Sequence, residues 1–351
     1  MEIRIYDSSL NFLGIIENHT SLLWNRKYFE PGNFELHLPM TITNYSLIKQ
    51  GNLIWKKSSK EAGVIEYITR EETSENSQMT VKGRFLSSYM DRRLIKDTYT
   101  ANNINVEVAM REILTNATSI PLVELGELNN YEEKVTFQAT YKNLLTYETR
   151  LSKYSNIAYR FRPDFTRKKI YFETYRGIDR TMAQKDRSRV VFSESYKNVK
   201  NAKYEENSQL YKNVCYVGGQ GDDSNRTYVI AGDDSITGLE RREVFLSATD
   251  IQQKDLSLEE YKAALIQRGE SALNEDTIVE SFDCSCEANG NFIYKEDYDL
   301  GDVVTVIKES WGLSIDLRIT EIQEVYENES AKIELTFGTP LPEVINWSSN
   351  S

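Results

Sequence analysis

Apolar and polar residues alternate with a period of two through most of the first hundred positions. The runs that carry this alternation include Ile3 and Ile5, Leu22 and Trp24, Phe34 to Leu38, Val64 to Ile68, and Met79 to Val81. Successive side chains of a strand point to opposite faces, so the pattern is typical of strands that bury one face. Turn-forming residues separate the runs, as expected of a small barrel or sandwich. We therefore predict a first, tube-like β-barrel domain at residues 1–98.

A helical period replaces this alternation after residue 98. Apolar residues recur three and four positions apart at Val106, Ala109, Ile113, Leu114 and Ala117. Asn102 or Asn103 is available as the N-cap, and Pro121 lies beyond the end. A second helix is expected from about Thr140, followed by a strand at 157–161. Residues 99–200 are therefore predicted to form an α+β domain.

Strand patterns return in the last third of the chain. One helix interrupts them, opening at Ser257 with Glu260 three residues later, which is the spacing of a capping box. Its expected apolar stripe consists of Leu258, Tyr261, Leu265 and Leu273. The predicted domain boundaries are 201–245 and 277–340 for a second β-barrel, 246–276 for a helical insertion and 341–351 for a C-terminal tail.

A repeated arrangement links the two β segments. A strand begins near Gly51 and a strand-turn-strand follows to Gly83, and the same order runs from Gly301 to Gly338. Residues 53–55 would then correspond to 303–305, and 79–81 to 333–335. Unrelated hairpins can also look alike, and this alternative stays open. The repeat favours a mixed, mainly β (α+β) fold with two similar β-barrel domains, an α+β domain between them and a helical insertion in the second barrel.

Charge is distributed unevenly along the chain. Against 42 Lys and Arg stand 54 Asp and Glu, a net charge of −12, which disfavours general or sequence-specific nucleic-acid binding. Residues 150–189 hold twelve basic and four acidic residues, a local balance of +8. We predict that this segment makes head-to-tail contact with another copy of the chain or docks on an acidic neighbour. The alternatives are an ordinary solvated face and, because aromatic residues are interspersed, a single-stranded nucleic-acid site.

The sequence carries no recognisable membrane or catalytic signal. We find no stretch long and apolar enough for a membrane span and no signal peptide at the N-terminus, so neither stable membrane insertion nor export is expected. Cys215, Cys284 and Cys286 are predicted to be buried free thiols. The two histidines, His19 and His37, lie too far away in sequence to complete a zinc site with them.

Motifs with a possible chemical role also have simpler explanations. The glycine-rich run 218–221 precedes a strand rather than a helix, so it is predicted to be a hairpin loop and not a phosphate site. The acidic turns at 221–223 and 232–234 lack the spacing of a calcium loop and are expected to be solvated. We therefore predict a protein that is not an enzyme, with no catalytic, metal-binding or cofactor-binding residue.

Several segments in order resemble the N-terminal tail-hub proteins of siphophages and prophages, in particular the ReqiPepy-type tail family related to myophage baseplate hubs. The opening MEIRIYDSSLNFLGIIE, Leu22–Trp24 and Tyr28–Leu36 carry the first part of the resemblance. The remaining segments are Val81–Arg84 with Asp91–Arg93, Asn213–Gly219 with Arg226, Gly238 with Arg241–Glu243 and Phe245, Tyr298–Val304, and Thr336–Gly338. These motifs resemble turns and core strands of the family's fold rather than catalytic residues.

The resemblance implies a structural protein of the virion. Hubs of this kind are homotrimers in which two barrels per chain give six units that match a hexameric tail tube. It implies that the protein lies at the tail tip, forms part of the DNA channel and is synthesised in the host bacterial cytoplasm. The implied partners are the distal tail or tail-tube ring, the tape-measure protein, and receptor-binding or fibre proteins. Alternatives are a tail-associated carbohydrate-binding or glycan-degrading protein and a small-molecule-binding β protein of the host.

Overall fold

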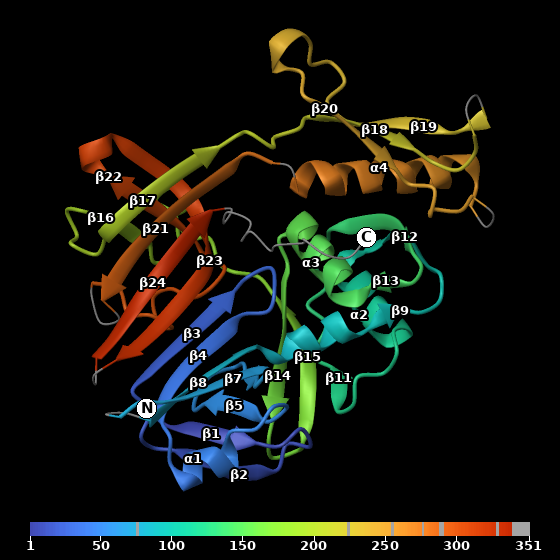
Figure 1. The fold of residues 1–351 in the computed structure, drawn as a ribbon. Helices are drawn as coiled ribbons and strands as arrows, with labels where there is room; N and C mark the ends of the chain where they lie inside the picture. The colour runs from blue at the N-terminus through green and yellow to red at the C-terminus, as the bar shows by residue number, and fades with distance from the viewer. Residues whose placement is uncertain are drawn as a thin grey trace. The chain divides into compact units, whose positions relative to one another are not determined.

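The described part of the computed structural model forms two compact units (Figure 1). The structure describes residues 1–74, 77–222, 225–253, 256–275, 277–287, 291–327 and 330–338. Unit 1 comprises Met1–Trp24, Phe29–Arg176 and Leu210–Thr277, and unit 2 comprises Asn25–Tyr28, Gly177–Gln209 and Ile278–Ser351. The division into two units is based on contacts and does not separate individual domains. The predicted domain boundaries therefore stay a prediction. The predicted tail at 341–351 lies outside the described residues.

Two sets of neighbouring strands make up the β part of unit 1. The first has the order β2-β1-β5-β6, from β2 (Phe12–Ile16), β1 (Ile3–Tyr6), β5 (Leu53–Lys56) and β6 (Gly63–Val64). The second has the order β3-β4-β8-β7, from β3 (Ser21–Lys27), β4 (Asn33–Pro39), β8 (Ser77–Arg84) and β7 (Tyr67–Glu72). A short helix, α1 (Ile42–Leu47), connects the two sets. The predicted alternation is confirmed in β4, where Phe34, Leu36 and Leu38 are buried.

The α+β part of unit 1 contains both predicted helices, α2 (Val106–Asn116) and α3 (Leu144–Ser155). Its shorter elements are η1 (Leu86–Arg92), β9 (Leu94–Ile95), β10 (Tyr99–Asn105), β11 (Val123–Leu125), β12 (Lys134–Ala139), β13 (Lys142–Asn143), β14 (Ala158–Asp164) and β15 (Lys169–Tyr175). The predicted N-cap of α2 was wrong: Asn105 caps the helix and accepts a hydrogen bond from the Val108 N–H. Pairing with β12 keeps residues 99–105 extended, so the helix begins later.

A separate three-stranded sheet and the fourth helix also belong to unit 1. The sheet has the order β19-β18-β20, from β19 (Tyr228–Gly232), β18 (Val214–Gly218) and β20 (Glu243–Ser247), with η3 (Gly238–Glu240) before β20. Helix α4 (Leu258–Glu275) packs against it through Tyr261 and Leu265. The predicted capping box is confirmed, since the Glu260 N–H donates to Ser257 and the Ser257 N–H donates to Glu260. Leu258, expected on the apolar stripe, is exposed instead.

Unit 2 contributes six strands of a larger sheet, and these pair in the order β17-β21-β24-β23-β22-β16. Its strands are β16 (Val191–Ser193), β17 (Lys200–Asn207), β21 (Val279–Glu287), β22 (Val303–Lys308), β23 (Leu313–Glu327) and β24 (Ser330–Gly338), with η4 (Glu309–Trp311) between β22 and β23. The fold is thus mainly β and of the α+β class, as predicted. The sheets of the described residues include no closed barrel.

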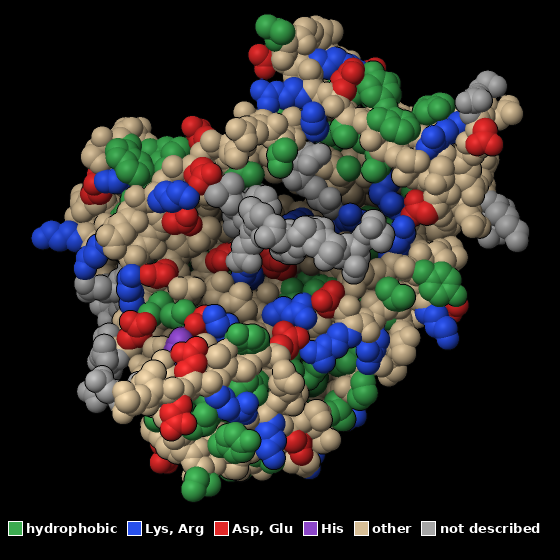
Figure 2. Space-filling view, viewed as in Figure 1, with side chains coloured by type: hydrophobic (Ala, Val, Ile, Leu, Met, Phe, Trp, Pro, Cys, Tyr) green, Lys and Arg blue, Asp and Glu red, His purple; other side chains and the backbone are tan. Residues whose placement is uncertain are grey.

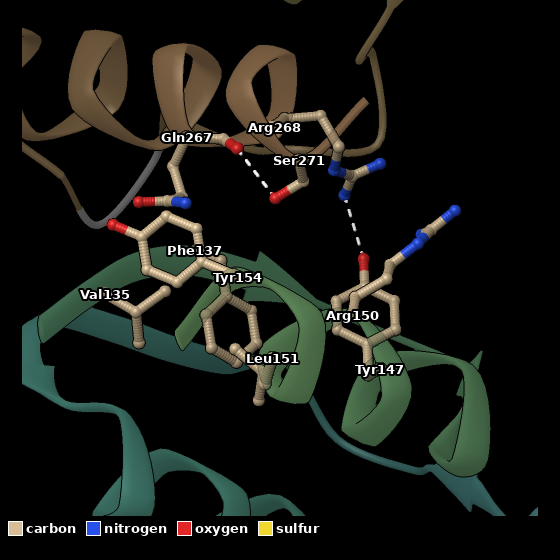
Figure 3. A pocket seen from close by; sticks show the side chains of 9 residues that line it. All are labelled: Val135, Phe137, Tyr147, Arg150, Leu151, Tyr154, Gln267, Arg268 and Ser271. Carbon is tan, nitrogen blue, oxygen red and sulfur yellow. Dashed lines mark hydrogen bonds between the residues drawn. The ribbon is translucent and has the colours of Figure 1, made fainter. Parts of the chain in front are cut away.

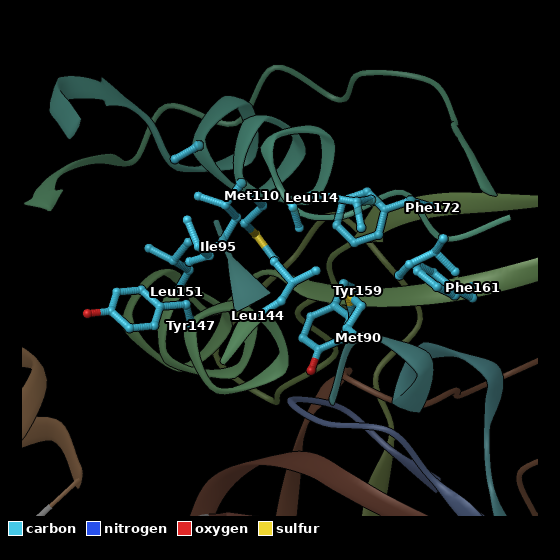
Figure 4. Packing of buried hydrophobic residues seen from close by; sticks show 14 of the residues in the cluster. Met90, Ile95, Met110, Leu114, Leu144, Tyr147, Leu151, Tyr159, Phe161 and Phe172 are labelled. Atoms are coloured by element: carbon cyan, nitrogen blue, oxygen red, sulfur yellow. The ribbon is translucent and has the colours of Figure 1, made fainter. Parts of the chain in front are cut away.

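The largest apolar core of unit 1 lies among α2, α3 and the strands β14 and β15 (Figure 4). Met110 and Leu114 of α2 face Leu144 and Leu151 of α3, and Phe172 packs beside them. Burial of each such side chain contributes about 1.5–3 kcal/mol. The period of apolar residues in the two helices therefore reports their packing correctly.

Candidate functional site

The same order of strands occurs in both units. In unit 1 the order is β3, β4, β8, then β7 with β6, then β5 and β1. In unit 2 the corresponding order is β17, β21, β24, then β23, then β22 and β16. The pairings β4–β8, β7–β8 and β5–β6 are antiparallel, and so are β21–β24, β23–β24 and β22–β23. The long strand β23 takes the place of β6 and β7 together. The two segments therefore share strand order, and they share strand direction in these antiparallel pairings.

A pair of backbone hydrogen bonds recurs at the glycine that opens each segment. The Gly51 N–H donates to the Ile65 carbonyl at 2.9 Å, and the Ile65 N–H donates to the Asn52 carbonyl. The Gly301 N–H likewise donates to the Ile319 carbonyl at 2.8 Å, and the Ile319 N–H donates to Asp302. Both glycines have a positive φ, +84° and +94°, which a residue with a Cβ adopts only at a cost. The repeat thus extends to the conformation of single residues.

The register of the strands confirms the predicted correspondence of 53–55 with 303–305 and of 79–81 with 333–335. Val81 of β8 pairs with Ile68 of β7. In the same way, Leu335 of β24 pairs with Ile322 of β23. The closing glycines, Gly83 and Gly338, do not correspond, because the register makes Gly83 equivalent to Phe337. The outer neighbours differ too: β1 is antiparallel to β5, whereas β16 is parallel to β22.

Ion pairs neutralise much of the basic segment 150–189 within the chain. Arg160 and Arg162 both bind Glu173, at 2.9 and 2.5 Å. Burial alone would raise the pKa of Glu173, but the two arginines lower it below its usual value. The other carboxylate partners are Asp164 for Arg167, Glu124 for Lys169, Glu133 for Arg176 and, in unit 2, Asp302 for Arg180. Docking of residues 150–189 on an acidic neighbour therefore stays a prediction, and it rests on the other basic residues of the segment.

The visible face of the molecule carries both signs of charge. Figure 2 shows Lys and Arg side chains interspersed with Asp and Glu, together with scattered apolar side chains. The aromatic residues of the basic segment are largely explained by packing, because Tyr159, Phe161 and Phe172 are buried. This burial removes them from any surface on which bases could stack.

The histidines and cysteines have structural surroundings. His37 lies 2.9 Å from Glu35 on strand β4, and burial lowers the pKa of half-buried His19. Cys215 and Cys284 are buried and not disulfide-bonded, as predicted, while the side chain of Cys286 lies outside the described residues. No group of three or more His, Cys, Asp or Glu among the described residues is arranged to hold a metal ion.

The glycine-rich run at 218–221 forms the predicted hairpin loop between β18 and β19. The Arg226 side chain closes it by donating to the carbonyls of Gly218 and Gly219, each at 2.9 Å. Of the acidic turns, Asp233 caps the backbone N–H of Ser235 and Asp234 binds Arg241. Asp223 lies outside the described residues.

A small recess in unit 1 is lined by β12, α3 and α4 (Figure 3). Val135, Phe137 and Leu151 form apolar walls, and Arg268 donates to the Tyr147 hydroxyl at 3.0 Å. The other lining residues are Arg150, Tyr154, Gln267 and Ser271. None of the nine is a carboxylate, histidine or cysteine.

A second, open recess lies on the solvent face of the strands β4, β8 and β7. Glu35 is its centre, with contacts of 2.9 Å to both His37 and Lys82. Burial would raise the pKa of Glu35, but Lys82 and His37 lower it below its usual value. The ion pair with Lys82 keeps the Glu35 carboxyl group ionised, which makes it a poor proton donor.

One buried carboxyl group escaped the sequence analysis. Glu148 of α3 is fully buried, and neither of its oxygens has a hydrogen-bond partner among the described residues. Burial raises its pKa well above the usual value. The helical period gave the signal, because Glu148 lies four residues after Leu144 and one turn before the buried Ser152. The group is enclosed by core side chains, which makes it a feature of stability rather than a reactive site.

No helix in the described part of the chain combines the length and hydropathy that crossing a bilayer requires. The chain's distinctive feature is the strand pattern that its two units share.

Known structures with a similar fold include three tail proteins, two of them from prophages. Prophage tail protein gp18 from Listeria monocytogenes EGD-e is 16% identical, with a TM-score of 0.57 over 98% of this chain and 96% of that one. The 43 kDa tail protein of prophage MuSo2 from Shewanella oneidensis is 13% identical, with a TM-score of 0.59 over 97% and 99% of the two chains. A tail protein from Neisseria meningitidis MC58 is 10% identical, with a TM-score of 0.57 over 96% of each.

The comparisons with sequences give one family. No curated protein matches the chain significantly. The model of the siphovirus ReqiPepy6 Gp37-like proteins matches residues 2–339, nearly the whole length. The chain therefore belongs to the siphovirus ReqiPepy6 Gp37-like protein family.

Proposed function

We propose that this protein is a structural hub at the tip of a phage tail or phage-tail-like particle. It joins the hexameric tail tube to the adsorption apparatus and forms part of the channel for DNA. The observation that carries this proposal is the strand pattern repeated in the two units, with its matching glycine hydrogen bonds. Membership of a siphovirus protein family and the fold of prophage tail proteins support the same conclusion.

Symmetry connects the repeat to this role. A trimer can dock on a six-fold tube if each chain offers two nearly equivalent units, related by about 60° about the trimer axis. We propose that the two repeated segments belong to two β-barrels and that three chains close a ring of six. The domain boundaries predicted from the sequence are part of this proposal, with a larger insertion between β17 and β21 that includes β18–β20 and α4.

The proposed role is non-enzymatic. Its support is a recess between α3 and α4 without carboxylate, histidine or cysteine side chains, and the ion pair of Glu35 with Lys82 in the open recess. The proposed partners are further copies of the chain, the tail-tube ring, the tape-measure protein and fibre or receptor-binding proteins. Host recognition and cell-wall cleavage would then belong to other polypeptides of the particle.

Electron microscopy of the producing particles with antibody labelling tests this function. Label is expected at one end of the tail, and quantitative mass spectrometry should give three copies of the chain per tail. Disruption of the gene should leave tails that lack the tip structure. Label spread along the tube, or particles without the chain, would contradict the proposal.

A further inference from the structure

The sheet β19-β18-β20 has one covered face and one uncovered face. Cys215, Val217 and Ala231 are buried on the first face against α4 (Figure 1). On the other face Ile230, Tyr216 and Phe245 lie side by side on the three strands. Tyr228 lies two residues before Ile230 on β19, opposite Gly218. Tyr228 and Phe245 are 54% and 55% exposed. Aromatic side chains gathered on an open sheet face are typical of a protein contact.

An arginine stands among these aromatic residues without a carboxylate. The Arg226 guanidinium lies 5.6 Å from the ring centre of Tyr228 and 5.5 Å from that of Phe245. Among the described residues it donates only to neutral groups, the carbonyls of Gly218 and Gly219 and the Ser247 hydroxyl. The nearby Arg241, in contrast, binds two carboxylates. We call Tyr216, Arg226, Tyr228, Ile230 and Phe245 the aromatic face.

The end of β11 and the loop after it combine apolar side chains with a negative charge. Leu125 and Leu128 are 38% and 42% exposed, and Glu127 between them has no ion-pair partner among the described residues. The loop backbone is held firmly, because Arg111 donates to the Gly126 and Glu127 carbonyls and the Gly126 N–H donates to Phe172. Little conformational entropy would be lost when it binds. We call residues 124–128 the leucine loop.

We propose that the aromatic face of one copy of this chain binds the leucine loop of a second copy. Leu125 and Leu128 would pack on Tyr228, Ile230 and Phe245, and the Glu127 carboxylate would bind the Arg226 guanidinium. The argument is complementarity, since each surface supplies the apolar area and the charge that the other lacks. The chain holds 54 Asp and Glu against 42 Lys and Arg, so carboxylates are the more numerous charged groups that another copy can offer to this arginine.

The contact joins two different surfaces and is therefore heterologous. Such contacts repeat around an axis and close a ring when the rotation fits, which an isologous contact cannot do beyond a dimer. The inference deepens the proposed hub function, because it assigns residues to the contact between the chains of the trimer. The contact itself can be tested without the tail.

Cross-linking of the full chain tests the contact directly. A double variant with Leu128→Cys and Phe245→Cys should give intermolecular disulfides, seen as dimers and trimers on a non-reducing gel, and each single variant should give none. Purified protein and assembled particles are tested in parallel. Particles that contain the chain but show no cross-link would overturn the contact. Particles without the chain would count against the hub function, and the purified protein would then decide the contact.

A charge swap gives the second test. Arg226→Glu should reduce cross-linking of the double-cysteine chain at least about tenfold, as expected for loss of a close charge pair. Combining it with Glu127→Arg should restore cross-linking to near its original level. Glu132→Arg, which reverses an exposed carboxylate outside the loop, is the matched control and should not restore it. Equal yields for all variants would overturn the assigned pairing.

Discussion

Replacement of Glu148 gives the sharpest test of how this protein is held together. The carboxyl group is fully buried, its oxygens lack hydrogen-bond partners in the described residues, and burial raises its pKa well above the usual 4.5. The folded protein thus keeps a proton that the unfolded chain releases above about pH 4.5. Glu148 therefore lowers the free energy of unfolding as pH rises from 4.5 toward the folded-state pKa, and the penalty is absent below 4.5.

The size of the effect follows from one proton. Over that pH window the free energy of unfolding of wild type should fall relative to Glu148→Gln by about 1.4 kcal/mol per pH unit. Glu148→Met, which also removes the unpaired polar group, should be more stable than wild type by about 1–3 kcal/mol even at pH 4.5. Only the difference between variants is used, because other carboxylates and His19 titrate too.

Urea unfolding followed by tryptophan fluorescence between pH 4.5 and 7.5 measures these differences. Glu132→Gln serves as the control, since it removes an exposed carboxylate with no contact described here. Its stability difference from wild type should stay near zero at every pH. A constant difference between wild type and Glu148→Gln would refute the reasoning, because it would mean that the buried carboxyl group does not titrate differently on folding.

Three further predictions concern chemistry, charge and the repeated glycines. Purified protein should leave host peptidoglycan and polysaccharide intact in zymograms, and activity abolished by one carboxylate substitution would contradict the structural role. Arg160→Glu with Arg162→Glu should destabilise unit 1 by about 3–5 kcal/mol in thermal or urea unfolding and weaken incorporation into particles. The control Arg167→Glu, at a side chain 74% exposed whose ion pair with Asp164 is 3.9 Å long, should lower stability by less than about 1 kcal/mol and test surface charge across a range of salt. Gly51→Ala should cost about 1–2 kcal/mol for its positive φ. Gly301→Ala should cost about 2–5 kcal/mol, because its Cβ would also lie 2.2 Å from the Tyr28 ring, and equal costs at both glycines would contradict the steric argument.

Local signals in the sequence were read correctly where the interaction itself is local. The capping box of Ser257 and Glu260 involves residues three positions apart, and it forms as predicted. The opening glycines Gly51 and Gly301 were also located, because a positive φ restricts the residue type at a single position. Apolar alternation in β4 reports burial for the same reason, since the two faces of a strand are fixed by backbone geometry.

Features that depend on pairing between distant segments were missed. The start of α2 was misplaced because β12, some thirty residues later, holds Tyr99–Asn105 in a strand. The +8 balance of residues 150–189 suggested an external partner, yet Arg160 and Arg162 meet Glu173 across the β14–β15 pair. A count of charges along the chain contains no strand register, and the register decides which charges meet.

The sequence by itself determined the mainly β character, the α+β segment and the correspondence of the two repeated segments, because periodicity and glycine positions act through the local backbone. Only the tertiary structure decided that β18–β20 form a sheet of their own with one open face. It alone placed Arg226 between Tyr228 and Phe245 and enclosed Glu148 without a partner. These outcomes follow from which surfaces exclude water together, and that is a property of the packed chain rather than of any short stretch of sequence.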